Sequence, residues 1–345
     1  AMMAARKRRL ERTPRFLRRF VEDKPGPPKP FDPATRDPVM IFERLQQVSG
    51  MQAMAFAVLG EAELAIAASE RLLKRAPPGS PHVAVASVPK ILALMHMGRT
   101  RDLRATAEQA TAIFERAGER LPPPLRIFWF LSLYLRGLGE ALAGTTAWEQ
   151  PAAKALALAE RFDLPQERGF ALLPALVRAC LCGDPEGFAR AYAAVEEITR
   201  RLGFPHVLNS RLRLWTPTYY LERGERELAR ATCTRLDALA KATRDTWIAT
   251  YAAVYQGFDA LSDGDLTRAD ALLTTACEGA RTKKLGRLTT ALCARGELLV
   301  SLRRFDEARP VLEEAFARAT SPDTGTPYDE AIARRLMAHL PNEDA

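Results

Sequence analysis

Hydrophobic and polar residues alternate along this chain with the period of a helix, and one long unit recurs. In each unit an apolar helical segment ends at a short polar turn, and an alanine-rich amphipathic segment follows, as in residues 260–280 (ALSDGDLTRADALLTTACEGA). The turns share a marker position, which is glycine in all but the last: Gly60, Gly98, Gly144, Gly183, Gly224, Gly264 and Arg304. Neighbouring markers lie 38 to 46 residues apart. A helical period repeated at a nearly constant spacing predicts stacked helical hairpins.

A small residue after the turn indicates how the two helices of a hairpin pack. The position four or five residues beyond the marker holds alanine in four units: Ala65, Ala229, Ala269 and Ala308. Two helices joined by so short a turn cross closely there, and a large side chain would force them apart. A single hairpin cannot bury its apolar faces alone, so neighbours must stack on it. We therefore predict an all-α, right-handed α-solenoid of about seven antiparallel helix hairpins.

Two segments test this prediction. Residues 81–88 (PHVAVASV) carry the alternating valines of a strand, but they fall where the repeat requires a helix. We expect a helix there, because tertiary context overrides local propensity. Residues 126–137 (RIFWFLSLYLRG) are too apolar for an exposed surface. They predict a helix that is central to the stack or buried against another element.

The last units resemble the tetratricopeptide repeat family. Within residues 205–320 the resemblance rests on Tyr220, on the first-helix glycines Gly257 and Gly296, on the turn glycines Gly224 and Gly264, and on the second-helix alanines Ala229, Ala269 and Ala308. The match is weaker over residues 40–204. The unit of about 40 residues is longer than that of the family, the first-helix tryptophan is mostly missing, and Arg295 stands where leucine is usual. Longer units of this kind look like the C-terminal arms of bacterial signalling kinases and STAND-type ATPases.

The resemblance also implies a binding groove. In such stacks the first helix of each unit lines the concave face, and the family's groove positions fall on Arg211, Thr218, Tyr251, Phe258 and Glu297. An aromatic and polar groove suits an extended peptide or a partner helix, because aromatic side chains give a large contact area at low entropic cost. The alternative is that Tyr251 and Phe258 are core residues, since their helical spacing is equally typical of a buried face.

The charge of the chain lies at one end. The net charge is +8, and residues 1–30 supply seven of those charges with ten Lys/Arg and three acidic residues. We expect residues 1–37 to form a basic, proline-rich linker or tail and residues 38–345 to form the repeat domain. The basic cluster consists of Arg6, Lys7, Arg8, Arg9, Arg12, Arg15, Arg18 and Arg19. Such a cluster could bind the phosphates of nucleic acid or of an anionic membrane, or it could be a solvated linker.

Residue patterns for catalysis, metals or cofactors are weak. The chain has no Gly-Lys dipeptide and hence no P-loop, and its four histidines are scattered singly. Cys180 and Cys182 would project from a helix about 200° apart, which disfavours a shared zinc ion. Ser87 and Lys90 match an acyl-enzyme spacing, but a proline-kinked helix explains them better. We expect no enzymatic activity and no cofactor, and we expect Asp263 and Asp265 to be turn and helix-start residues rather than calcium ligands.

Composition adds little to this picture. With 47% hydrophobic and 27% charged residues the chain is typical of a folded protein, and the apolar surroundings of the five cysteines favour a cytoplasmic location.

We predict a non-catalytic interaction or scaffold module that binds a partner peptide or helix in its concave groove. Two alternatives stay open. The chain could be the sensor arm of a larger bacterial kinase or STAND-type ATPase, or a phosphate-binding adaptor that uses its basic tail.

Overall fold

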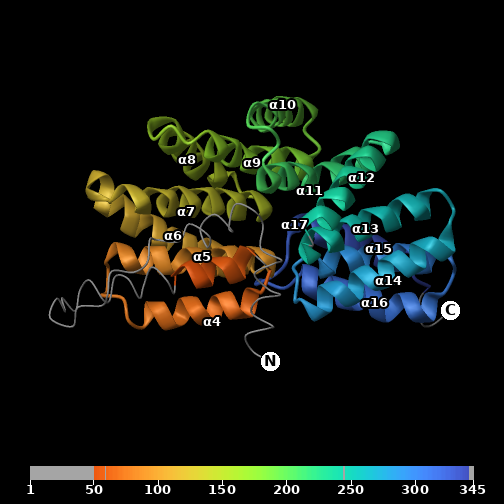
Figure 1. Cartoon of the computed structure of the whole chain (residues 1–345). Coiled ribbons are helices and arrows are strands. Elements are labelled where there is room, and N and C mark those ends of the chain that lie inside the picture. Colours follow the sequence, from red (N-terminus) through yellow and green to blue (C-terminus); the bar gives the residue numbers. More distant parts are fainter. Residues whose placement is uncertain (1–49, 59, 244, 342–345) are drawn as a thin grey trace.

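The computed structural model describes residues 50–58, 60–243 and 245–341, and within them all regular structure is helical (Figure 1). The predicted tail, residues 1–37, lies outside the described residues. Residues 50–58 are helical. The helices that follow are α4 (Ala62–Leu73), α5 (Pro81–His96), α6 (Thr100–Ala117), α7 (Pro123–Leu142), α8 (Glu149–Arg161), α9 (Pro165–Cys182), α10 (Pro185–Arg201), α11 (His206–Glu222), α12 (Arg226–Thr243), α13 (Thr246–Ser262), α14 (Leu266–Thr282), α15 (Leu288–Ser301), α16 (Phe305–Ala319) and α17 (Pro327–Met337).

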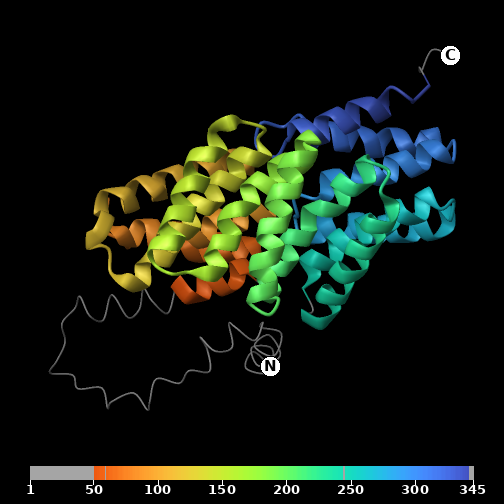
Figure 2. The same ribbon diagram turned by 90° about the horizontal axis from the view of Figure 1, so that it is seen from above.

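These helices form consecutive antiparallel hairpins, as predicted. Residues 50–58 pack against α4 through Ala53 and Ala57. The following pairs run from α5–α6 to α15–α16, and α17 ends the described chain without a hairpin partner. Seen from above, the stack runs from the N-terminal helices in orange to the C-terminal helices in blue (Figure 2). The predicted helix over residues 81–88 is confirmed as the start of α5. None of the helices between residues 50 and 341 that the structure describes is both long and apolar enough to cross a membrane.

Glycine occupies the turns because the chain there is left-handed. The six glycine markers all have φ between 67° and 78°, a region that residues with a Cβ rarely adopt. At the seventh turn the prediction was off by one residue: Arg303, not Arg304, has the positive φ, at 56°. Arg304 is the residue before α16, and its guanidinium pairs with Glu307. In the other units the alanine lies five residues after the left-handed glycine. The same spacing before Ala308 leads to Arg303.

The close crossing of the two helices in a hairpin is also confirmed. The four alanines beyond the turns are at most 2% exposed. On the first helices the same role falls to glycine: a Cβ added to Gly257 would lie 2.5 Å from Cδ2 of Leu273, and Gly296 faces Leu312 in the same way. The apolar segment from Arg126 forms most of α7, where Phe130, Leu133 and Leu135 are buried in the core shared with neighbouring helices.

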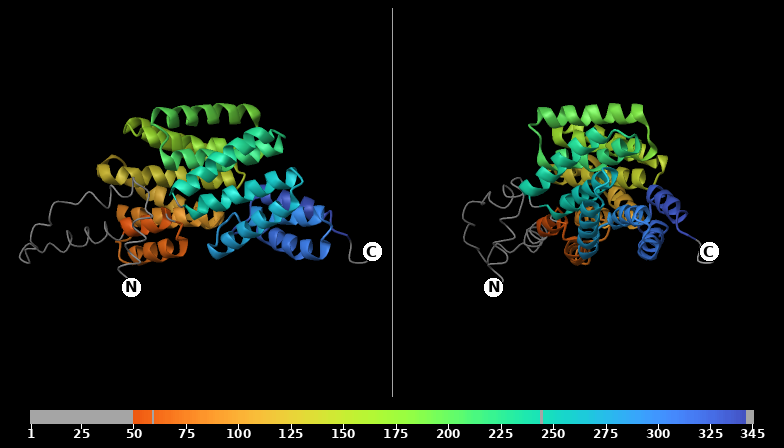
Figure 3. Two further views of the ribbon diagram at one scale, coloured as in Figure 1. Left: turned by 45° about the vertical axis from the view of Figure 1, so that its right-hand side comes forward. Right: turned by 90° about the vertical axis from the view of Figure 1, so that its right-hand side faces the viewer.

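The two ends of the solenoid meet. The N–H of Gly286, between α14 and α15, donates to the carbonyl of His96 at the end of α5 over 2.9 Å. The turn before it forms ion pairs with the turn into α4, Lys283 with Glu61 at 3.4 Å and Lys284 with Glu63. Figure 3 accordingly shows the orange and blue helices side by side beneath the central green ones. We call this closed arrangement the ring, and the first helices of its units face its interior.

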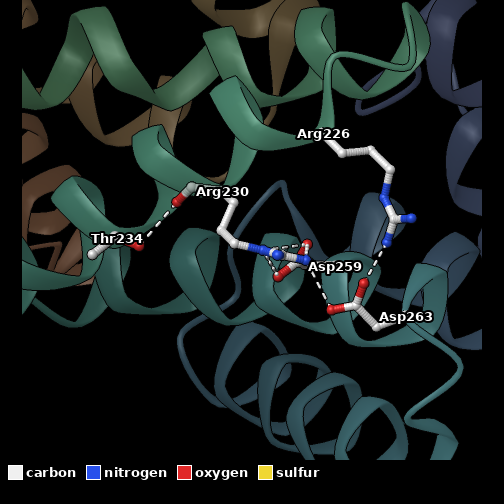
Figure 4. A network of polar contacts seen from close by, with 5 residues as sticks. All are labelled: Arg226, Arg230, Thr234, Asp259 and Asp263. Carbon is white, nitrogen blue, oxygen red and sulfur yellow. Dashed lines mark hydrogen bonds and ion pairs between the residues drawn. The ribbon is translucent and has the colours of Figure 1, made fainter.

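Neighbouring units are joined at the surface by charged pairs. Arg230 of α12 holds both carboxylate oxygens of Asp259 in α13 and reaches Asp263 at 2.8 Å, while Arg226 binds Asp263 at 2.6 Å (Figure 4). Asp265 caps α14 by accepting the N–H of Arg268 at 3.1 Å. The turn and helix-start roles predicted for Asp263 and Asp265 are thus confirmed.

Candidate binding chamber

A cavity of about 70 Å³ lies in the interior of the ring, where α5, α7, α9, α11 and α13 converge on the start of α15 and on the connection into α17. We call it the central chamber. Its charged and aromatic lining includes Arg211, Trp215, Trp247, Tyr251, Arg287 and Asp329. Segments from both ends of the chain therefore build one site.

Arg211 extends from α11 and stacks on an aromatic ring. Its guanidinium carbon lies 4.0 Å from the centroid of the Trp247 ring, and its Nη2 lies 3.2 Å from Nε2 of His96. Arginine donates only, so Nε2 of His96 must accept and carries no proton. Burial, together with the charge of Arg211, holds the pKa of His96 well below its usual range. Nη1 of Arg211 has no hydrogen-bond partner among the described residues.

Arg287 enters the chamber from the residue before α15. It is buried, with its guanidinium carbon 4.3 Å from the centroid of Trp215 and 4.7 Å from that of Tyr251. Nη1 donates to the hydroxyl of Thr290 at 3.0 Å, and Nη2 to the hydroxyl of Tyr255 at 3.4 Å. Nε has no partner in the described part of the chain. Arg287 is thus held by neutral groups, and cation–π contacts replace part of its lost hydration.

Asp329 is the acidic residue of the lining. Its Oδ1 accepts from the hydroxyl of Thr290 at 3.1 Å, and its Oδ2 accepts from the hydroxyl of Thr326 at 2.8 Å. Thr290 therefore links Asp329 to Arg287 without direct contact between the two charges. With His96 neutral, the lining carries two cations against one carboxylate. The chamber has a surplus of one positive charge.

The structure brings together two of the five residues predicted for the groove. Arg211 and Tyr251 both line the chamber. Thr218 is buried and its hydroxyl is 2.7 Å from that of Tyr255, so that it joins α11 to α13. Phe258 packs against the core and Tyr251 is a buried member of it, which is what the alternative interpretation of the sequence expected for both. Glu297 is half-buried outside the chamber lining, and desolvation raises its pKa.

Sequence reasoning missed most of the chamber. Trp215 follows Arg211 by four residues and Trp247 precedes Tyr251 by four, which places each pair on one helix face. That spacing was a usable signal. Arg287 and Asp329 had no such signal, because they stand at the starts of their helices, where no periodic helix face marks them.

The other candidate groups have structural roles. Ser87 donates to the carbonyl of Val83 within α5, and Lys90 pairs with Glu70. Cys180 is buried whereas Cys182 is exposed, so the two thiols do not share a site. A search of the described residues finds no group of three or more His, Cys, Asp or Glu that could hold a metal ion. The basic cluster from Arg6 to Arg19 lies outside the described residues.

Comparisons with known proteins agree with this fold. No protein-family model matches the chain, and no curated protein matches it. Among solved structures, the chain is similar to a Rap protein in complex with Competence and Sporulation Factor, with a TM-score of 0.56 and 12% sequence identity over 86% of this chain and 88% of that one. The apo form of RapI matches with a TM-score of 0.43 and 11% identity, over 86% of each chain. The first likeness extends over almost the whole solenoid and concerns the fold.

Proposed function

We propose that this protein is a non-catalytic interaction module that binds an extended peptide segment of a partner inside the ring. The observation that carries the proposal is the central chamber, in which first helices from both halves and the residue before α15 present two arginines and four large aromatic rings to one cavity. Arginine and aromatic side chains dominate binding energy at protein interfaces, because they combine contact area with polar groups of fixed geometry.

The structural likeness supports a binding role in general terms. The similar Rap protein was solved with Competence and Sporulation Factor bound, so a solenoid of this shape can hold a partner. A regulatory role, as the sensor arm of a larger signalling protein, would follow if closure of the ring depends on the partner. Phosphate binding by the basic cluster stays a prediction, because residues 1–37 lie outside the described part of the chain.

Peptide selection followed by hydrogen exchange tests this function. Peptides that bind the full chain would be selected from a random library by mRNA display. Amide hydrogen exchange of the chain would then be measured with and without an enriched peptide. We expect protection of the first helices α11, α13 and α15, which face the interior. Protection confined to the second helices α12 and α14, or failure to enrich any peptide, would contradict the proposal.

A further inference from the structure

We propose that the central chamber is a specific site for one carboxylate group, which the guanidiniums of Arg211 and Arg287 bind. This inference rests on the proposed function, because it names the chemical group of the peptide that the interior recognises. The carboxylate could be the C-terminus of the peptide or an Asp or Glu side chain, and both offer the same two oxygens.

Charge is the first argument. The chamber lining holds Arg211 and Arg287 against Asp329, and His96 is neutral because its Nε2 accepts from Arg211. The carboxylate of Asp245, outside the lining, also acts on Arg211, and its Oδ1 accepts the N–H groups of Trp247 and Ile248. A buried cation whose charge is only partly balanced is unfavourable, since low polarity weakens its solvation. One incoming carboxylate makes the chamber neutral. A phosphate dianion would instead leave a buried negative charge, so the balance favours a carboxylate.

Hydrogen bonding is the second argument. Nη1 of Arg211 and Nε of Arg287 are both buried and both lack partners in the part of the chain that the structure describes. The neighbouring polar groups already have hydrogen bonds: Asp329 accepts from two threonine hydroxyls, and the hydroxyl of Tyr255 accepts from Nη2 of Arg287 and donates to the carbonyl of Leu214. Guanidinium groups match the planar, two-oxygen geometry of a carboxylate, which makes such contacts strong.

The position of the two arginines is the third argument. Trp247 and Tyr251 are in contact, with centroids 4.9 Å apart, and each guanidinium lies on one of the two rings. The pair of rings therefore holds both cations at the same wall of the chamber. A volume of about 70 Å³ has room for a few water-sized groups. It fits a carboxylate and the atoms next to it, whereas the rest of a peptide must run along the ring interior.

The test uses a small aromatic carboxylate, so that it does not depend on knowing the peptide. Benzoate, benzamide and inorganic phosphate would be titrated into the full chain, with tryptophan fluorescence as the readout, because Trp215 and Trp247 line the site. We expect benzoate to bind and benzamide to bind at least about tenfold more weakly, since it lacks the charge. Equal binding of benzoate and benzamide, or tighter binding of phosphate, would overturn the inference.

Variants assign the effect to the two arginines. Arg211→Gln and Arg287→Gln should each weaken benzoate binding about tenfold or more. Arg230→Gln is the matched control, because Arg230 lies in the surface network of α12 and α13, and it should bind benzoate like the unmodified chain. If a glutamine variant does not fold, Arg211→Lys serves instead: it keeps the charge but loses the two-pronged geometry, and it should bind more weakly. Unchanged affinity in a folded variant of either arginine would refute the assignment.

Enriched peptides separate this inference from the proposed function. Amidation of the C-terminus and Glu→Gln or Asp→Asn changes in the peptide show which carboxylate is bound, and one of these changes should lower affinity about tenfold. A peptide that protects the interior helices but tolerates every such change leaves the proposed function standing and refutes the carboxylate site. Benzoate binding without any enriched peptide would support the site and contradict the peptide-binding function.

Discussion

Replacing Gly286 with alanine should open the ring. A Cβ at this position would lie 2.5 Å from Cα and 2.6 Å from the backbone nitrogen of Gly98. Both obstructing atoms belong to the backbone, so no side-chain rotation can relieve the clash. The two turns must move apart, which breaks the 2.9 Å hydrogen bond from Gly286 to His96 and weakens the ion pair of Lys283 with Glu61.

The expected cost follows from these contacts. One backbone hydrogen bond contributes about 1 kcal/mol, an exposed ion pair up to about 1 kcal/mol, and residual overpacking costs about 1–3 kcal/mol. We expect Gly286→Ala to lower the free energy of unfolding by roughly 2–5 kcal/mol. Gly224→Ala is the control. Gly224 has φ +72°, but a Cβ added there would meet open space. This variant should lower the free energy of unfolding by only about 1–2 kcal/mol, through left-handed strain.

Two measurements decide between these outcomes. Urea unfolding gives the free energies, and small-angle X-ray scattering gives the radius of gyration. Gly286→Ala should increase the radius of gyration, because the ends of the solenoid separate, whereas Gly224→Ala should leave it unchanged. If Gly286→Ala matches the unmodified chain in both measurements, the turns at Gly98 and Gly286 are not in contact and the ring is not closed.

Three further predictions follow from buried groups. Burial and Arg211 lower the pKa of His96, so the unfolded chain binds a proton at His96 more readily than the folded chain does. The free energy of unfolding should therefore fall below about pH 6.5, by up to about 1.4 kcal/mol per pH unit. Urea midpoints at pH 7.5 and 5.5 should show this slope, and the same slope in His96→Asn would contradict it. Four of the cysteines are buried and Cys182 is exposed, so only Cys182 should react quickly with a disulfide reagent in the folded chain. Rapid labelling of a second cysteine would contradict the burial of the other four. Tyr255→Phe leaves Thr218 without its hydroxyl partner and the carbonyl of Leu214 without its donor, so it should cost about 1–3 kcal/mol in thermal unfolding; a loss below about 0.5 kcal/mol would argue against this network.

The repeat architecture was predictable because it depends on local signals. Gly224 and Gly264 mark turns that need a left-handed residue, and Ala229 and Ala269 mark crossings that need a small one. Each signal lies within a few residues of the structure it causes. The one misplaced marker, Arg304 instead of Arg303, occurred where no glycine was present to fix the register.

The binding chamber was only partly predictable, because its assembly is not local. Arg211 and Tyr251 could be assigned to first helices and hence to the concave face. His96 and Gly286, in contrast, meet across 190 residues, and no periodicity along the chain encodes that contact. The chamber depends on this closure, since it brings Gly286 and the adjacent Arg287 to the end of α5.

We propose that the ring interior binds a partner segment. The most direct measurement is a crystal structure of the full chain with an enriched peptide. We predict peptide density inside the ring, with a carboxylate between the guanidiniums of Arg211 and Arg287. Peptide density on the outer helices, with no carboxylate at either guanidinium, would contradict binding in the ring interior.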